Sequence, residues 1–248
     1  MSNLDLVLAA AVVFFAYFLR GVTGFGSALV AVPLLVQMLP LTTVVPFIAT
    51  LDVVAALVLT GSGLRGRQVC WSEVWWLLPG SLLGIVVGLQ LLVNVDPDTL
   101  LTVLGLLVVI FGLRSLLGLH GERIISRPWA LLAGMAGGGI GAVFSTGGPP
   151  YVIYLAHRLS DKGAMRATLS AIFLIDGGLR LAAIMLAGLL WLPDMGWYLL
   201  GALPLMGAGL ALGDRVHVGL SARQMAVAVG ALLLTSGASL WLRVWLGD

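Results

Sequence analysis

The sequence predicts an all-α polytopic membrane protein with two inverted repeats, each a broken or re-entrant helical hairpin followed by three transmembrane helices. Its 248 residues are 60% hydrophobic and only 10% charged. Their mean hydropathy of +1.10 is that of a membrane protein rather than of a soluble domain. Long apolar runs alternate with short charged loops, and two of the runs are interrupted by clustered glycines.

The first apolar segment is interrupted between Arg20 and Pro33, where three glycines fall within six positions. Each glycine weakens a helix by about 1 kcal/mol relative to alanine. In lipid, irregular backbone persists only where it is buried in protein or lines a cavity. Arg20, an ionisable residue inside apolar sequence, favours a functional break. The competing interpretation is a glycine-rich face for helix packing.

The rest of the first half reads as three helices, expected over residues 41–60, 74–93 and 100–117. A basic loop precedes the second of these, and three tryptophans at 71, 75 and 76 predict an interfacial belt at its start. The polar stretch 119–128 is the best midpoint of the chain. We therefore expect a first membrane repeat over 1–120 and a second over 121–248, forming one integral membrane domain.

The second half repeats this layout. An apolar segment over 129–155 is expected to break at Gly137–Gly141 and at Ser145–Pro150, and three helices are expected over 167–190, 197–212 and 224–246. Five residues recur 125 positions later, which indicates a duplication: Pro79, Gly84, Gly88, Gly105 and Gly112 recur as Pro204, Gly209, Gly213, Gly230 and Gly237. Gly24 and Gly26 align with Gly139 and Gly141 at an offset of 115.

The basic residues predict the topology. If both broken segments are re-entrant, almost all the basic residues fall on one side of the membrane: Arg65, Arg67, Arg114, Arg123, Arg127, Arg158, Lys162, Arg166, Arg215 and Arg223. By the positive-inside rule that side is cytoplasmic. We therefore expect a multi-pass protein of the cytoplasmic (inner) cell membrane with both termini outside.

In an inverted-repeat transporter the two breaks meet near the bilayer midplane, where substrate binds. The expected substrate-binding residues are Arg20, Thr23, Gly24, Phe25, Gly26 and Ser27 from the first break and Ser145, Thr146, Gly147 and Gly148 from the second. Backbone N–H groups at helix starts and neighbouring hydroxyls suit the oxygens of a small anion. The alternative for these residues is tight helix packing by small side chains.

Two carboxylates lie inside predicted helices, Asp52 and Asp176, at an offset of 124. Ionised carboxylates in a membrane must be protonated, paired or hydrated. Arg180 lies one helical turn after Asp176 and can pair with it, while Arg20 is a candidate partner for Asp52. We consider a coupling or gating role for Asp52, Asp176 and Arg180 beside a purely structural ion pair.

The chain resembles the sulfite exporter TauE/SafE family of membrane permeases. The resemblance rests on Gly21-Val22-Thr23-Gly24-Phe25-Gly26-Ser27 running to Val32-Pro33, and on Gly137-Gly138-Gly139-Ile140-Gly141 followed by Gly147-Gly148-Pro149-Pro150. It covers essentially the whole chain. It implies a secondary permease for sulfite, sulfonates or related small organosulfur anions. We expect the anion to bind near the midplane, between the two breaks.

Other classes are less well supported. A membrane-embedded enzyme would need a nucleophile–base pair, which the sequence lacks, and Cys70 is the single cysteine. A cation, proton-coupled or metal permease using Asp52 and Asp176 is the main alternative. No metal site, cofactor or nucleic-acid partner is predicted. The expected partners are a small anionic substrate and the lipid bilayer, and the oligomeric state stays open, with a homodimer among the options.

Overall fold

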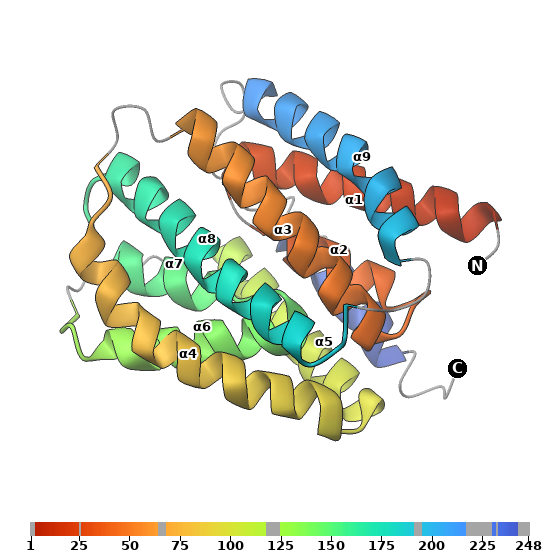
Figure 1. Cartoon of the computed structure of the whole chain (residues 1–248), viewed down its shortest axis with the longest axis horizontal. Coiled ribbons are helices and arrows are strands. Elements are labelled where there is room, and N and C mark those ends of the chain that lie inside the picture. Colours follow the sequence, from red (N-terminus) through yellow and green to blue (C-terminus); the bar gives the residue numbers. More distant parts are fainter. Residues whose placement is uncertain are drawn as a thin grey trace. The chain divides into compact units, whose positions relative to one another are not determined.

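A computed structural model of the chain confirms the all-helical class (Figure 1). It describes residues 3–24, 26–63, 68–117, 125–190, 195–216, 230–231 and 233–242, and no strand occurs within these ranges. The labelled helices are α1 (Asn3–Thr23), α2 (Ser27–Leu35), α3 (Leu41–Gly63), α4 (Trp71–Asn94), α5 (Pro97–Leu117), α6 (Trp129–Phe144), α7 (Gly148–Ala156), α8 (Lys162–Leu186) and α9 (Met195–Val216). A further short apolar helix covers Leu233–Leu242.

Among the described helices, six are long and apolar enough to cross a membrane: α1, α3, α4, α5, α8 and α9. A helix needs about 20 apolar residues to span the hydrocarbon core at 1.5 Å per residue. The apolar part of α1, Leu4–Thr23, has 20 residues. This first arm is therefore longer than expected for a re-entrant hairpin, whereas the corresponding arm of the second hairpin, α6, has 16 residues.

The chain forms two compact units that do not follow the sequence halves. Unit 1 comprises Met1–Val44, Asn94–Leu119 and Gly196–Asp248, and unit 2 comprises Val45–Val93 and His120–Met195. Each unit therefore combines one broken hairpin with helices from both halves of the sequence.

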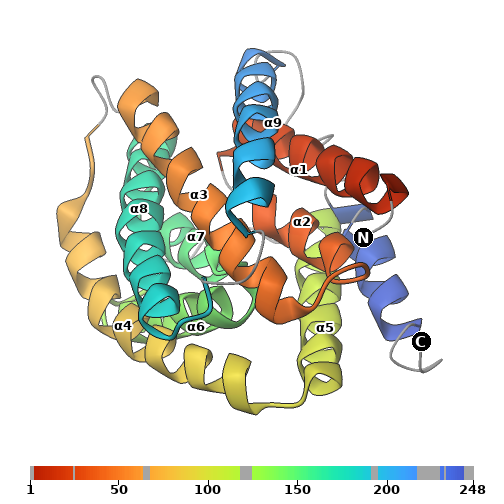
Figure 2. The same cartoon turned by 45° about the vertical axis from the view of Figure 1, so that its right-hand side comes forward.

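In unit 1, α9 packs along α1, as both views show (Figures 1 and 2). Glycines permit this approach. A Cβ at Gly209 would lie 2.5 Å from the carbonyl oxygen of Phe14, and one at Gly213 would clash with the carbonyl oxygen of Phe18. Small residues that bring helix backbones together are the usual basis of packing in membranes.

In unit 2, α4 packs along α6 in the same manner. A Cβ at Gly84 would clash with the carbonyl oxygen of Met135, and one at Gly88 would lie 2.5 Å from that of Gly139. The apolar core of this unit gathers side chains of α4, α6, α7 and α8: Val74, Leu77, Ala130, Tyr151, Tyr154, Leu155, Leu169 and Ile172.

The expected break at Gly137–Gly141 is wrong, because these residues are helical within α6. Their glycines serve close packing instead. A Cβ at Gly138 would clash with the backbone of Ser81 on α4, and one at Gly137 would lie 2.5 Å from the ring of Tyr151. Where a missing side chain lets a neighbouring helix or side chain approach closely, packing outweighs the intrinsic cost of glycine.

The helix expected over 167–190 begins earlier in the chain than predicted. α8 begins at Lys162 because Asp161 caps it, accepting a hydrogen bond from the N–H of Ala164 at 2.8 Å. A side-chain oxygen at this position satisfies one of the free N–H groups of the first helical turn.

Candidate substrate site at the helix breaks

The first break separates α1 from α2 within unit 1, as predicted. α1 ends at Thr23, and Gly24 and Gly26 adopt left-handed backbone conformations with φ of 85° and 91°. Residues other than glycine rarely adopt such angles. The N–H of Gly24 donates to the carbonyl oxygen of Arg20 at 2.7 Å, closing the last turn of α1. Phe25, also expected at the site, lies outside the described residues.

Arg20 is buried beside this break, with 4% of its surface exposed. Its Nη1 donates a hydrogen bond of 3.2 Å to the hydroxyl of Ser27, the first residue of α2. The two expected site residues therefore meet across the break. The hydroxyl of Thr23 donates to the carbonyl oxygen of Leu19 at 2.8 Å, so its hydrogen is not available to an anion in this conformation.

The second break separates α6 from α7 within unit 2. Ser145 has a left-handed φ of 55°, and its N–H donates to the carbonyl oxygen of Gly141 at 2.7 Å. Its hydroxyl donates to the carbonyl oxygen of Val45 at 3.1 Å. Ser145 and Thr146 are both buried. As at Thr23, the hydroxyl hydrogen of Ser145 is already engaged with a carbonyl group.

α7 starts at Gly148 without a side-chain cap, and Gly147 occupies the capping position. The first N–H groups of a helix have no partner within the helix, so an uncapped start leaves backbone donors for a ligand or water. Pro149 and Pro150 lack N–H groups, which confines these donors to the edge of the break. The expected site residues Gly147 and Gly148 therefore offer backbone rather than side-chain chemistry.

Asp176 is buried in α8 of unit 2, with 2% of its surface exposed. Its Oδ1 accepts hydrogen bonds from the hydroxyl of Ser81 on α4 and from that of Tyr151 on α7, the latter at 2.8 Å. Among the described residues Asp176 has no ion pair with Arg180 within 4.0 Å. Two hydroxyl donors from other helices therefore replace the partner suggested by helical spacing.

Asp52 and Arg180 are the other expected coupling or gating residues. Arg180 is buried in α8, with 5% of its surface exposed, and Asp52 lies in α3 with 9% exposed. α3 and α8 pack together one residue further along, where a Cβ at Gly177 would lie 3.3 Å from a methyl group of Val53. The structure thus brings Asp176 to Ser81 and Tyr151, groups that the sequence analysis did not select.

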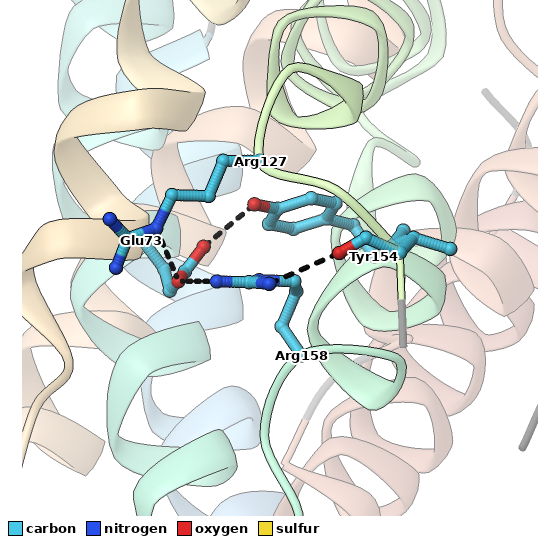
Figure 3. A network of polar contacts seen from close by, with 5 residues as sticks. Glu73, Arg127, Tyr154 and Arg158 are labelled. Atoms are coloured by element: carbon cyan, nitrogen blue, oxygen red, sulfur yellow. Dashed lines mark hydrogen bonds and ion pairs between the residues drawn. The ribbon is translucent and has the colours of Figure 1, made fainter. Parts of the chain in front are cut away.

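A second polar cluster in unit 2 was also missed by the sequence analysis (Figure 3). Glu73, in the first turn of α4, is 3% exposed. Its carboxylate accepts hydrogen bonds from Arg158 at 2.8 Å and from the hydroxyl of Tyr154 at 2.6 Å. Nε of Arg127 lies 3.6 Å from Oε1 of Glu73. Nη1 of Arg158 donates to the carbonyl oxygen of Ile125 at 3.1 Å.

This cluster ties the start of α4 to the segment before α6 and to the turn after α7. The hydrogen bond to Glu73 raises the pKa of the Arg158 guanidinium. An acidic residue in the first turn of an apolar helix, facing two loop arginines, was the signal available in the sequence. The sequence did not show that the loops carrying the two arginines lie beside the start of α4.

Comparisons with known proteins indicate a membrane transporter. A model of the family described as "Sulfite exporter TauE/SafE" matches residues 9–240. A curated protein of Comamonas testosteroni, "Probable inner membrane transporter protein TsaS", is 31% identical over 198 residues, covering 79% of this chain and 81% of that protein. No solved structure matches the chain.

Proposed function

The chain belongs to the sulfite exporter TauE/SafE family, and from this premise we propose that it is a secondary permease for small anions such as sulfite, sulfonates or related organosulfur anions. It is a membrane transporter and not an enzyme. The curated relative is an inner membrane transporter by name. The same location suits a chain with six apolar helices of membrane-spanning length among its described residues.

The observation that carries the anion assignment is the buried Arg20 at the first break. A guanidinium is charged at all physiological pH values and presents a planar set of donors that matches carboxylate, sulfonate and phosphate oxygens. Arg20 is held against the start of α2 by its hydrogen bond to Ser27. An anion at this place would add acceptors for the guanidinium and for the backbone donors of the break.

The proposed substrate-binding groups follow from these contacts. At the first break they are Arg20, Ser27 and the backbone of Thr23, Gly24 and Gly26, and at the second they are the backbone groups over 145–148. The hydroxyl of Ser145 ties the second break to Val45, whereas the hydroxyl of Thr23 bonds within the last turn of α1. Asp52 and Asp176 take the proposed role in coupling or gating, because buried carboxylates in a transporter are suited to carry or exchange a proton.

An inverted repeat is part of the same proposal, and the packing of α5 on the C-terminal helix supports it. A Cβ at Gly105 would lie 3.4 Å from the carbonyl oxygen of Gly237, and one at Gly112 would lie 3.1 Å from that of Gly230. At the 125-residue offset Gly105 corresponds to Gly230 and Gly112 to Gly237. Gly105 therefore contacts the repeat equivalent of Gly112, and Gly112 contacts the repeat equivalent of Gly105. Such reciprocal contacts are the pattern of a two-fold axis between antiparallel helices.

The two hairpins support the repeat with a revised offset. Gly24 and Ser145 lie 121 positions apart, both have left-handed backbone, and each N–H donates at 2.7 Å to the residue four positions earlier. The packing helices agree: Gly209 faces Phe14 and Gly84 faces Met135, and Phe14 and Met135 are also 121 positions apart. We therefore propose that equivalent residues at the two breaks lie 121 positions apart rather than 115. The proposed repeats remain 1–120 and 121–248. Both termini remain outside in the proposed topology.

The proposal is tested by ligand-dependent thermal stabilisation of the detergent-purified full chain. Sulfite, methanesulfonate, chloride and a divalent metal ion are compared, since binding to the folded state raises the melting temperature with ligand concentration. We expect stabilisation by sulfite or methanesulfonate and its loss in Arg20→Ala. Stabilisation by the metal ion alone would contradict the anion assignment and support the cation alternative.

A further inference from the structure

Arg180 lies with its guanidinium against the second helix break. A Cβ built at Gly141 would be 2.5 Å from Nη1 of Arg180 and 3.6 Å from the Cα of Gly147. The end of the side chain is therefore next to the residues that join α6 to α7. It reaches this place only because position 141 has no side chain.

The carboxylate nearest in sequence does not neutralise this cation by direct contact. Asp176, one turn earlier on α8, accepts its hydrogen bonds from Ser81 and Tyr151. Within the described part of the chain, Nε of Arg180 is buried and has no hydrogen-bond partner. A buried charged donor without an acceptor is costly and calls for an explanation, such as a bound ion.

The break supplies the remaining features of an anion site. α7 has nine residues, and its start has no side-chain cap. Free N–H groups at a helix start attract negative charge, and a guanidinium beside them adds a full positive charge with directional donors. Asp176 stays near enough to moderate the positive potential, which would let a bound anion leave again.

We propose that Arg180 directly binds the transported anion at the second break, the counterpart of Arg20 at the first. This inference rests on the proposed anion-permease function. At the offset of 121 positions Arg20 corresponds to Gly141, whose missing side chain leaves room for Arg180. The guanidinium of the second break thus comes from α8 instead of from the hairpin itself. The ligand is a small oxyanion, such as sulfite or a sulfonate, with at least two oxygens for the guanidinium.

Gly141→Ala tests this inference without removing any charge. The added methyl group would meet the end of the flexible Arg180 side chain, so we expect the guanidinium to shift while the fold is retained. Gly139→Ala is the matched control on the same helix, because its Cβ would lie at an ordinary 3.5 Å from its nearest neighbour. Arg180→Lys keeps the charge but loses the planar pair of donors.

The dissociation constants for sulfite and methanesulfonate are measured by thermal-shift titration of the full chain, together with the melting temperature without ligand. Losing one charge-assisted contact weakens binding by about tenfold or more. We expect that loss in Gly141→Ala and in Arg180→Lys, and a change below about twofold in Gly139→Ala.

Two results would overturn the inference while leaving the proposed function intact. One is wild-type affinity in both Gly141→Ala and Arg180→Lys. The other is a lower ligand-free melting temperature with unchanged dissociation constants, which would make Arg180 structural. If the wild-type chain binds neither anion, the proposed function itself fails.

Discussion

Replacing Glu73 by glutamine should destabilise unit 2 measurably, because this buried carboxylate connects three segments of the unit (Figure 3). Glutamine preserves the size of the side chain and can still accept a hydrogen bond from Tyr154. It removes the negative charge that faces Arg158 at 2.8 Å and Arg127 at 3.6 Å. The substitution therefore isolates the ionic part of the cluster.

The size of the effect follows from the exposure of the two arginines. A hydrogen bond to a charged group contributes about 1.5–3 kcal/mol. The side chain of Arg158 is 17% exposed, so water partly compensates its lost partner and the larger cost of an orphaned buried charge does not apply in full. The side chain of Arg127 is 51% exposed and adds less than about 1 kcal/mol. We expect a total loss of about 2–3 kcal/mol.

In a chain of this length about 1 kcal/mol corresponds to a shift of roughly 2–4 °C. The melting temperature in detergent should therefore fall by about 4–12 °C. The control is Asp98→Asn, an exposed carboxylate at the start of α5, which should change it far less. Adding Arg158→Gln to Glu73→Gln should cost less than the two single losses together, since no unpaired charge remains. Additive losses, or an unchanged melting temperature in Glu73→Gln, would refute the ionic cluster.

Three further predictions concern topology, packing and the buried carboxylate. Single cysteines placed at positions 159–163 in a Cys70→Ala background should react only with thiol reagents that reach the cytoplasm, and labelling from outside would reverse the proposed orientation. Gly84→Ala should lower folded yield and melting temperature by overpacking α4 against α6, whereas Gly207→Ala, with nothing within 4 Å of its Cβ, should leave both unchanged. Tyr151→Phe removes one of two hydroxyl donors to the carboxylate of α8 and should cost about 1–3 kcal/mol in thermal stability; a neutral effect would mean that this hydrogen bond does not stabilise the fold.

The sequence was sufficient for features set by local chemistry. Apolar length and glycine spacing located the long helices and the first break, where Gly24 and Gly26 need backbone angles that other residues avoid. The same reasoning misplaced the start of the second break, because glycine within a helix can equally serve close packing. Gly137 and Gly138 look like breakers until the positions of Tyr151 and Ser81 are known.

Side-chain partners from distant segments could not be predicted in this way. Helical spacing offered Arg180 as the neighbour of Asp176, but hydroxyls from α4 and α7 reach the carboxylate instead. The position of Arg180 beside Gly141 likewise depends on how α8 packs on α6. Such contacts depend on tertiary packing. The spacing of residues along the chain does not show which distant segments pack together.

Counterflow in proteoliposomes tests the central claim most directly. Vesicles carrying the full chain are loaded with unlabelled sulfite and diluted into a trace of labelled sulfite without an imposed ion gradient. A secondary permease exchanges the two, so labelled sulfite should accumulate transiently above its equilibrium level, with Asp98→Asn behaving like the wild type and Arg20→Ala showing no accumulation. Absence of counterflow with both sulfite and methanesulfonate, or counterflow that Arg20→Ala leaves unchanged, would contradict an anion permease that works through the first break.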